Sequence, residues 1–512
     1  MPKVSSKFLW WSFFGLAFIA LVWIQYYGLA HYQYLVPPGD DPMNHFLAAN
    51  NIFEQKESVF SILQRGGYPP AYHFMVAKAA EIFQADPLDI IKWSYPGILI
   101  LCSLAVFLLA YSILGIEAGT AAFFIYSFAT RLPVQTINDG SYPNLLAAQF
   151  LLPLGLAFLT FFIKSRSKYR MWLLTLSILI LLLIPLTHHF TTFYLLAIGT
   201  VAWPVVLVSF WIFRRWQWKR GLLLFLIYFT LISGLAFVFL NTSLFTSAKS
   251  LASTMIHFGS SYPFFEIVAT AKSVAWKIPG DFISNFGTIS LLILVLGFLA
   301  FPIILFRTKD KNWLFTFIFI YIWAIILFIG SRMTFLSNPD RLARDMTLPL
   351  AISAGVLLGY LAQDNKKIFS FKILLLTIFV IALFLPVKQR IISAKAYEPM
   401  IRATSADMEI FAFIKAENIN PEKVLMQSFN FYAPKLLPGF REDYCFDGIN
   451  CQGIYPERDY LIMSTQLGWL PSHVRTDSPE IYTSLENLIL VKHSQSPIND
   501  VYLFKIIHPN NF

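Results

Sequence analysis

The chain has 512 residues, of which 57% are hydrophobic and only 13% are charged, about half the charged fraction of an average soluble domain. This composition excludes a soluble globular enzyme and predicts a polytopic membrane protein. The formal net charge of +10 resides in short loops between apolar segments, so it does not indicate a nucleic-acid partner.

Eleven apolar segments are long enough, or nearly so, to cross a bilayer as helices. The first follows a basic N-terminus and lacks a small-residue cleavage site, so it is interpreted as a retained signal anchor. The third segment is short, and without it the topology beyond would invert. The predicted spans are 8–30, 93–114, 118–131, 143–163, 171–187, 190–212, 221–240, 285–306, 313–330, 347–362 and 369–386.

The loops between these segments differ in charge. The N-terminus and one set of alternate loops hold 16 basic and three acidic residues, whereas the rest of the chain holds 23 basic and 26 acidic residues. Because basic loops stay in the cytoplasm, we expect a cytoplasmic N-terminus in the cell membrane. The 31–92 loop, the 242–284 loop and the C-terminal region are then extracytoplasmic.

Hydrophobicity falls near residue 387, which divides the chain into a membrane domain, 1–387, and an extracytoplasmic α/β domain, 388–512. In the second domain a helix is predicted over 405–418. Four strands are expected at 424–429, 459–465, 487–493 and 501–507. Cys445 and Cys451 lie in this domain, where a disulfide could form, and the cysteine and histidine spacing does not predict a zinc site.

The sequence PPGDDPMNH at 37–45 follows the first span directly. Asp41 is predicted to cap a helix that begins at Pro42 and continues to residue 55. The adjacent carboxylates Asp40 and Asp41 raise each other's pKa, and such a pair can act as a general base or hold a divalent cation. The alternative is a plain helix cap at Asp41 with Asp40 in solvent, and the segment alone leaves both open.

A second helix is predicted to start after Tyr68-Pro69-Pro70 and to run to Phe83. Both first-loop helices are amphipathic, so we expect them to lie along the outer membrane surface. His45 falls one turn after Asp41 on the same helix face, and His73 lies near the start of the second helix. Either histidine could orient a carboxylate or bind phosphate, or could simply fill an amphipathic face.

Two later segments place polar residues at the membrane boundary. Asp139 lies in the Asp-Gly turn of TINDGSYPNLL, and Tyr142 makes the same turn polar at a depth where polarity is costly. His188 and His189 lie between two adjacent spans. The alternative for Asp139 is a plain turn without a functional role. The two histidines could equally lie in a hydrated loop.

Arginines occur on the predicted external side, against the usual charge bias. Arg341 and Arg344 lie in SNPDRLARD, just before a span. Guanidinium groups are the preferred partners of phosphate, and a lipid phosphate is a natural ligand there. The competing interpretation pairs both arginines with Asp340 and Asp345 in a local ion-pair network.

The sequence lacks the motifs of several classes of enzyme and transporter. The chain has no glycine-rich phosphate loop, Walker motif, GxSxG or HExxH. This argues against an ATP-driven pump and against a metalloprotease of that type. No internal repeat is evident, which argues against a transporter built from inverted repeats.

The architecture of the chain resembles the GT-C superfamily of membrane glycosyltransferases. It consists of one span, a large external loop with an early acidic pair, many further spans and an external C-terminal domain. That group includes protein mannosyltransferases, aminoarabinose transferases and oligosaccharyltransferase catalytic subunits. The architecture matches over the whole chain, and the chain is most similar to uncharacterised prokaryotic members. The motifs that carry the resemblance are GDDPMNH (39–45), GGYPPAYH (66–73), DGSYPNLLAAQFLLPL (139–154), THHF (187–190) and NPDRLARDMTLPLAI (338–352).

The resemblance implies a sugar donor on a polyprenyl phosphate or diphosphate and an inverting transfer to a glycan, lipid or protein acceptor at the external membrane face. It makes Asp40 or Asp41 the general base or, together with Asp139, a ligand of Mn²⁺ or Mg²⁺. The donor phosphate would contact Arg341, Arg344, His188 and His189, and the substrate pocket would include His45, His73, Asp139 and Tyr142. The C-terminal domain lacks an obvious WWDxG motif, which argues against protein N-glycosylation.

Two other classes of function remain open. A lipid-linked saccharide flippase or transporter would also carry external arginines, but it is expected to place charges deep within its spans, and these spans are almost free of charge. A non-catalytic protein of cell-envelope assembly would work through its C-terminal domain. Changing the first-loop aspartates would then have no effect.

Overall fold

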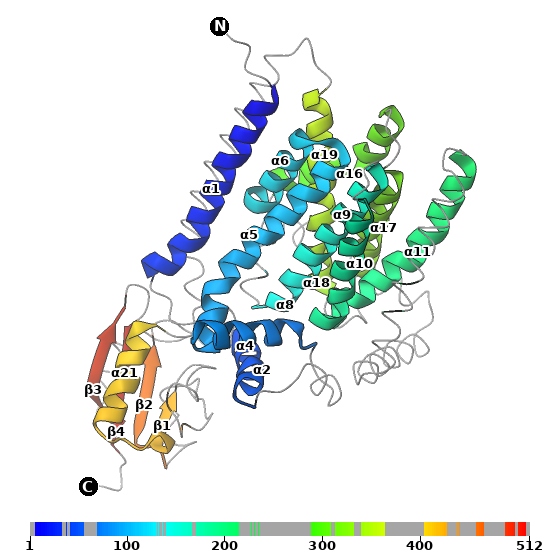
Figure 1. Ribbon diagram of the computed structural model, residues 1–512. Coiled ribbons are helices and arrows are strands. Elements are labelled where there is room, and N and C mark those ends of the chain that lie inside the picture. Colours follow the sequence, from blue (N-terminus) through cyan, green and yellow to red (C-terminus); the bar gives the residue numbers. More distant parts are fainter. Residues whose placement is uncertain are drawn as a thin grey trace, which may run out of the picture.

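Long apolar helices form one part of the structure, and a small sheet with a single helix forms the other (Figure 1). Helical bundles and closed barrels are the two structures that satisfy their backbone groups inside a bilayer. The computed structural model describes residues 6–32, 37, 41–55, 69–130, 132, 136, 140–165, 170–213, 227, 230, 234, 288–308, 313–331, 339–363, 404–426, 437, 440, 457–464, 487–496 and 500–507.

Within the described residues, nine of the eleven predicted spans coincide with helices. These helices are α1 (Ser6–Tyr32), α5 (Pro87–Leu114), α6 (Ile116–Phe124) with η1 (Ile125–Ala129), α8 (Tyr142–Asn144) with η2 (Leu145–Leu151) and α9 (Leu152–Lys164), α10 (Arg170–Thr187), α11 (His189–Phe213), α16 (Thr288–Arg307), α17 (Leu314–Gly330) and α19 (Thr347–Gln363). Among the residues that the structure describes, six helices are long and apolar enough to cross a membrane, which supports a multi-pass membrane protein. The predicted spans 221–240 and 369–386 lie almost entirely outside the described residues.

The predicted third span corresponds to a shorter helix. The sequence placed it at 118–131, whereas the helix covers 116–129 and is one of three shorter apolar helices. Gly115, with φ of +91°, separates it from α5. The spans predicted at 285–306 and 313–330 also coincide with shorter apolar helices, so the membrane crossing of all three stays a prediction.

Helix α19 lies between α6 and α16 and contacts both. Gly355 and Gly359 are one turn apart on α19 and face α6. An added Cβ at Gly355 would lie 2.6 Å from the Cα of Ala122, and one at Gly359 would lie 2.6 Å from the Cα of Ala118. The two backbones therefore touch directly, which is the small-xxx-small packing of membrane helices.

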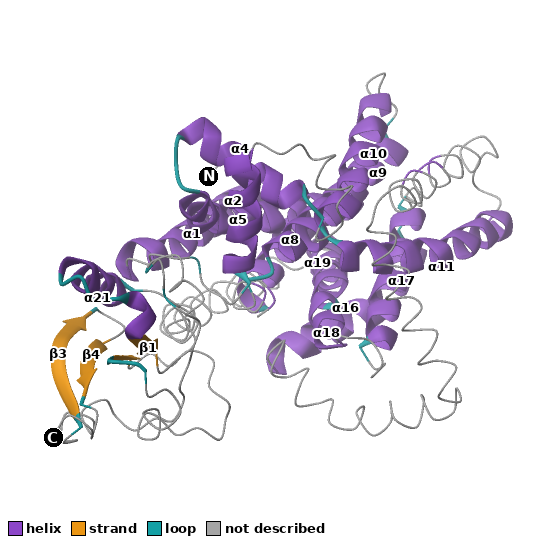
Figure 2. Ribbon diagram, turned by 90° about the horizontal axis from the view of Figure 1, so that it is seen from below, coloured by secondary structure: helices purple, strands orange, loops and turns teal. Residues whose placement is uncertain are grey.

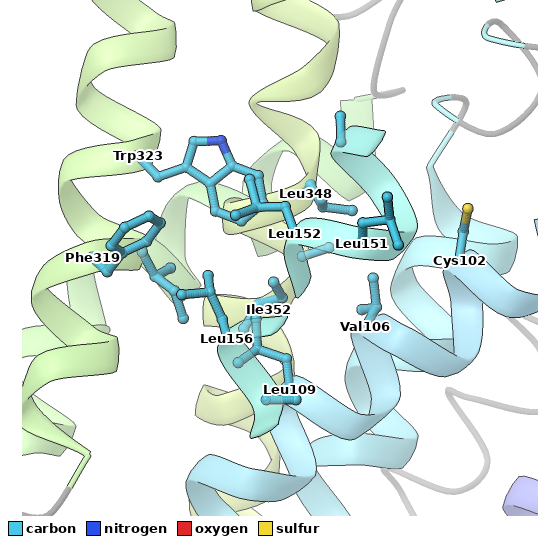
Figure 3. Packing of buried hydrophobic residues seen from close by; sticks show 14 of the residues in the cluster. Cys102, Val106, Leu109, Leu151, Leu152, Leu156, Phe319, Trp323, Leu348 and Ile352 are labelled. Carbon is cyan, nitrogen blue, oxygen red and sulfur yellow. The ribbon is translucent and has the colours of Figure 1, made fainter. Parts of the chain in front are cut away.

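The interior of the bundle is a continuous apolar core (Figure 3). Leu109 of α5 and Leu156 of α9 lie beside Phe319 and Trp323 of α17 and Ile352 of α19. All five side chains are buried. Burial of such side chains fixes the helices relative to one another, so the ends of the helices can hold polar residues in defined positions.

Two π-helical segments, η1 and η2, are joined through buried polar side chains. The Tyr126 hydroxyl donates to Oε1 of Gln149 at 2.6 Å, and Nε2 of Gln149 donates to Oγ1 of Thr136 at 3.0 Å. π-helical turns occur often at functional sites. This chain of hydrogen bonds anchors Thr136, which precedes the turn at Gly140.

The ends of α5, α9 and α19 lie together. Nζ of Lys164 in α9 donates to the carbonyls of Ser112 and Ile113 at the end of α5, at 3.0 and 2.9 Å. Nε2 of Gln363 in α19 donates to the carbonyl of Leu114. The start of α1 lies at this end of the bundle, and α2, α4, α8 and α18 lie at the opposite end (Figure 1). This arrangement agrees with the alternation of the predicted loops, and the membrane face that each end contacts stays a prediction.

The predicted first-loop helices are present as α2 (Pro42–Gln55) and α4 (Ala71–Phe83). The two helices pack against each other and against the start of α5. The outer side of α4 exposes Met75, Ile82 and Phe83. The amphipathic pattern is therefore confirmed, and the orientation of these helices along a membrane surface stays a prediction.

The C-terminal part contains α21 (Ser405–Ala416), η4 (Pro421–Lys423) and a mixed four-stranded sheet (Figure 2). The strands are β1 (Val424–Met426), β2 (Tyr460–Ser464), β3 (Leu488–Gln495) and β4 (Asp500–Ile506), in the order β1-β2-β4-β3. β1 is parallel to β2, and the other pairs are antiparallel. The predicted helix and strands are thus found, and the domain boundary near residue 387 and Cys445 and Cys451 lie outside the described residues.

Candidate functional site

The site begins where α2 begins. The carbonyl of Asp41 accepts the first helical hydrogen bond, from the backbone N–H of His45 at 3.1 Å. Asp41 is half-buried and occupies the N-cap position that the sequence predicts. Its chain neighbour Asp40 lies outside the described residues, as does Asp139.

Gly140 packs against this helix start. An added Cβ at Gly140 would lie 2.3 Å from Cδ of Pro42 and 3.0 Å from the backbone nitrogen of Asp41. Gly140 also has φ of +67°, a conformation that glycine adopts without strain. The Asp-Gly turn and the acidic pair, separated by nearly 100 residues in sequence, are therefore brought together at Asp41 and Gly140.

Two buried histidines link α2 to α4. Nδ1 of His45 lies 3.0 Å from Nε2 of His73. Burial, followed by the Coulomb effect of His73, lowers the pKa of His45 to about 3, and burial lowers the pKa of His73 to about 4, although the carbonyls of Gly140 and Pro69 act in the opposite direction. The pair is therefore neutral at physiological pH.

Aromatic rings extend this pair toward the bundle. Tyr142 of α8 is fully buried, and its ring centroid lies 6.4 Å from those of His45 and Tyr72 and 6.0 Å from that of Tyr95. We call His45, Tyr72, His73 and Tyr142 the first-loop cluster. The sequence predicted three of its members, and Tyr72 was missed although it lies beside His73 in GGYPPAYH.

The histidines between α10 and α11 form a second group. His188 caps α11: its Nδ1 accepts from the backbone N–H of Thr191 at 3.2 Å and lies 2.7 Å from Oγ1 of Thr191. The Thr191 hydroxyl also donates to Oδ1 of Asn144 in α8 at 3.2 Å. The ring of His189 lies 5.4 Å from that of His188. Sequence reasoning did not assign a role to Asn144 or Thr191, because their contact spans 47 residues.

The short helix α18 (Pro339–Asp345) carries the predicted phosphate-binding arginines. Arg344 is only 7% exposed and Asp345 only 2% exposed. α18 packs on α17 and α19 and lies at the same end of the bundle as α8 (Figure 1). The side chains of Arg341 and Asp340 lie outside the described residues, so the ion-pair alternative stays untested.

The tentative metal ligands were Asp40, Asp41 and Asp139. Of these the structure describes Asp41 alone. Within the described parts of the chain, no three histidine, cysteine, aspartate or glutamate residues are grouped as a metal site would require. The described side chains do not by themselves complete a cation site, and Mn²⁺ or Mg²⁺ stays a prediction.

Solved structures share this fold. The archaeal oligosaccharyltransferase AglB from Archaeoglobus fulgidus, in complex with an inhibitory peptide and a dolichol-phosphate, superposes with a TM-score of 0.57 and 13% identity over 90% of this chain and 69% of that chain. ArnT from Cupriavidus metallidurans bound to undecaprenyl phosphate gives 0.51 and 13% identity over 95% and 97% of the two chains. The Archaeoglobus enzyme with Zn and sulfate gives 0.51 and 13% identity over 88% and 68%.

At this level of identity the likeness is one of fold, and it confirms the predicted resemblance to the GT-C superfamily at that level. No curated protein matches the chain. The model of DUF6541, a family of unknown function, matches residues 52–394, which is more than half of the chain. The chain therefore belongs to the DUF6541 family, and its fold is that of the GT-C membrane glycosyltransferases.

Proposed function

We propose that this protein is a membrane glycosyltransferase. It transfers a sugar, with inversion, from a polyprenyl-phosphate or diphosphate donor to a glycan, lipid or protein acceptor at the extracytoplasmic face. The observation that carries the proposal is the contact of Gly140 with Asp41 and Pro42, which joins two separate polar segments at one end of a GT-C fold. The dolichol-phosphate and undecaprenyl phosphate held by AglB and ArnT support the donor class.

On the acceptor side, Asp41 or its neighbour Asp40 removes the proton from the acceptor hydroxyl. The hydroxyl oxygen attacks the anomeric carbon of the donor sugar from the face opposite the departing phosphate. The nearby pair of His45 and His73 is neutral, so it does not offset the negative charge of the base. It holds α2 against α4 and thereby fixes the direction of the helix start.

On the donor side, Arg344 provides a permanent positive charge in a buried position. Such a charge stabilises the phosphate as negative charge develops on it, and it does so more strongly away from water. Arg341, one turn earlier on α18, and His188 and His189 at the start of α11 complete the proposed phosphate contacts. We also assign Tyr142 and Asp139 to the substrate pocket.

A Mn²⁺ or Mg²⁺ ion on Asp40, Asp41 and Asp139 is an optional part of the proposal, since carboxylate oxygens are its preferred ligands. No step above uses the ion. The metal dependence of turnover decides whether the protein uses this ion.

The test is an assay of purified protein in lipid with a panel of polyprenyl-phosphate sugars, with and without Mn²⁺ or Mg²⁺. We expect wild type to release polyprenyl phosphate and the Asp40→Asn/Asp41→Asn double variant to lose at least 100-fold in rate. The matched control is Glu54→Gln/Glu81→Gln, which neutralises two exposed acids on α2 and α4. A folded, fully active Asp40/Asp41 variant would end the proposal.

The same assay separates the alternatives. Binding of a lipid-linked sugar that survives the double substitution, without turnover of any donor, would favour a flippase or transporter. Neither binding nor turnover in wild type would favour a non-catalytic assembly protein.

A further inference from the structure

Three buried polar side chains are hydrogen-bonded to one another in the apolar interior of the bundle. Tyr126 belongs to η1 and Gln149 to η2, and both side chains, like that of Thr136, are fully buried. We call these three residues the η1–η2 cluster. Buried polar partners stabilise a fold little more than apolar side chains of the same shape, but a fully bonded set of them holds one arrangement. This points to a role in position rather than in net stability.

The protons of the cluster fix the orientation of its central amide. The Thr136 hydroxyl donates to the carbonyl of Leu132 at 2.9 Å, so toward Gln149, 3.0 Å away, its oxygen accepts. The amide nitrogen of Gln149 therefore faces Thr136. Its Oε1 then accepts the proton of the Tyr126 hydroxyl at 2.6 Å. One orientation of the Gln149 amide satisfies all three bonds.

A backbone hydrogen bond continues from the cluster to the turn at Gly140. The carbonyl of Thr136 accepts from the backbone N–H of Ser141 at 3.2 Å, and this bond closes the segment 136–141. By sequence, the segment contains both Asp139 and Gly140. The cluster therefore anchors one end of the segment, and the bond to Ser141 holds the other end next to it.

Gly140 contacts the start of α2 in two ways. An added Cβ at Gly140 would lie 3.0 Å from the backbone nitrogen of Asp41, and the Gly140 carbonyl forms a hydrogen bond with His45. Because these contacts are close, the turn cannot shift without moving the first turn of α2. An unbroken series of contacts thus connects Gln149 in the interior to Asp41.

We propose that the η1–η2 cluster consists of positioning residues, which hold the segment 136–141 against the start of α2. The cluster thereby fixes Asp41 and its neighbour Asp40 for removal of the acceptor proton. This inference rests on the proposed function and adds positioning residues to its acceptor side. The three side chains act through the turn and do not contact a substrate.

A purely structural role, in which the cluster only joins η1 to η2, is the competing explanation. The two explanations differ for a cluster made wholly apolar by Tyr126→Phe/Gln149→Met/Thr136→Val. This triple variant keeps the approximate shape of each side chain and removes both partners of each bond between side chains. Such a double removal costs little, so we expect an unfolding midpoint within about 3 °C of wild type in lipid nanodiscs.

The rate of the triple variant tests the proposal. We expect kcat to fall roughly 10- to 100-fold with the polyprenyl-phosphate sugar that wild type uses best, because a base misplaced by about 1 Å reacts slowly. Binding of undecaprenyl phosphate should stay within about twofold of wild type, since the donor contacts are unchanged. A folded triple variant with wild-type kcat would overturn the inference.

The matched control removes a buried hydrogen bond elsewhere in the bundle. Oγ1 of Thr160 in α9 lies 2.6 Å from Oγ1 of Thr316 in α17, and both side chains are buried. Thr160 is one turn from Lys164, at the end of the bundle opposite α2 (Figure 1). We expect Thr160→Val/Thr316→Val to keep wild-type kcat, and an equal loss of kcat in this control would show that any buried bond has the same effect.

A conservative substitution separates the hydroxyl of Thr136 from its bulk. Thr136→Val leaves the Gln149 amide nitrogen without its acceptor, whereas Thr136→Ser keeps a hydroxyl. We expect Thr136→Val to lower kcat about tenfold and Thr136→Ser to stay within about twofold of wild type. Equal effects of the two substitutions would overturn the role of the hydrogen bonds.

An independent readout does not need activity. Hydrogen exchange is followed by mass spectrometry with fragmentation to single residues, at the backbone amides of Ser141 and His45. We expect both amides to exchange at least about tenfold faster in the triple variant, because the turn and the start of α2 open more easily. The Thr160→Val/Thr316→Val control should exchange them at wild-type rates. Unchanged exchange in the triple variant would overturn the inference even in an active enzyme.

The two experiments also distinguish this inference from the proposed function. Wild type that turns over no donor would refute the proposed function and the part of the cluster in it. The exchange rates would still decide whether the cluster holds the start of α2. Active wild type with unchanged exchange and unchanged kcat in the triple variant would refute the positioning role alone.

Discussion

At the residue scale, Gly140 is the most constrained position near the candidate base. Its φ of +67° and its contact with Pro42 both exclude a side chain. Local sequence predicts a turn at Asp-Gly, but it does not predict the contact, because Pro42 lies far away along the chain. The requirement for glycine at this position therefore has a tertiary cause as well as a local one.

We predict that Gly140→Ala shifts the start of α2 and lowers transferase activity at least tenfold. The left-handed backbone alone costs about 1–2 kcal/mol for alanine, and the methyl group would overlap Cδ of Pro42. The matched control is Gly15→Ala in α1, where an added Cβ meets nothing within 4 Å. Wild-type rates in both variants would show that Asp41 need not be held at this place.

Arg344 is the second informative residue. Lysine keeps the charge but lacks the planar fork that binds two phosphate oxygens. We predict that Arg344→Lys lowers kcat/KM about tenfold and that Arg344→Gln lowers it at least 100-fold, because the charge that stabilises the departing phosphate is then lost.

The control for Arg344 is Arg307→Gln, at the end of α16. Thermal unfolding of all three variants distinguishes lost phosphate binding from lost folding. Arg344→Gln with normal folding and normal kcat/KM would remove Arg344 from the donor site.

At the element scale, we expect the contact between α2 and α4 to depend on pH. The histidine pKa values, normally 6.5, are lowered to about 3 for His45 and about 4 for His73. The unfolded chain therefore binds more protons than the folded chain between pH 6.5 and about 3–4, and stability falls as the pH decreases through that window. Above pH 6.5 the stability is fully present.

We predict that the thermal unfolding midpoint falls between pH 7 and pH 4.5, with a slope of at most about 1.4 kcal/mol per pH unit for each histidine. His45→Gln/His73→Gln should flatten this dependence. The control is His493→Gln, which changes an exposed histidine on β3. A pH dependence unchanged in the double variant would place its origin elsewhere.

The seam between α19 and α6 is the second element-scale feature. Gly355→Ala would place a methyl group 2.6 Å from the backbone of Ala122, and overpacking of this kind typically costs about 1–3 kcal/mol. We predict a lower unfolding midpoint and a smaller monodisperse fraction on size-exclusion chromatography. Gly97→Ala in α5, whose added Cβ would meet only an ordinary contact at 3.7 Å, should behave as wild type.

At the scale of the whole molecule, hydropathy and loop charge predict most of the architecture. Apolar runs predict the helices because the bilayer interior accepts few alternatives, and the sheet of the C-terminal part follows from short strands such as 501–507. The GxxxG pattern of Gly355 and Gly359 was present in the sequence and was missed, although it predicts the tight seam of α19.

The remaining features depend on contacts between distant segments. Neither the bond between Asn144 and Thr191 nor the burial of Arg344 has a local signal, because each requires the packing of several helices. The short helix α18 also escaped prediction, since the residues before the predicted span 347–362 read as a loop. Candidate residues could be named from the sequence, but the bonds that join them could not.

Helix α8 consists of Tyr142, Pro143 and Asn144, and the proline ring restricts its backbone. Tyr142 contacts the proposed acceptor side through His45, while Asn144 contacts the proposed donor side through Thr191. Two residues separated by one stiff peptide unit cannot move independently. We therefore expect a small molecule that displaces the Tyr142 ring to disturb both proposed substrate sites together, so that one ligand could inhibit binding of donor and acceptor alike.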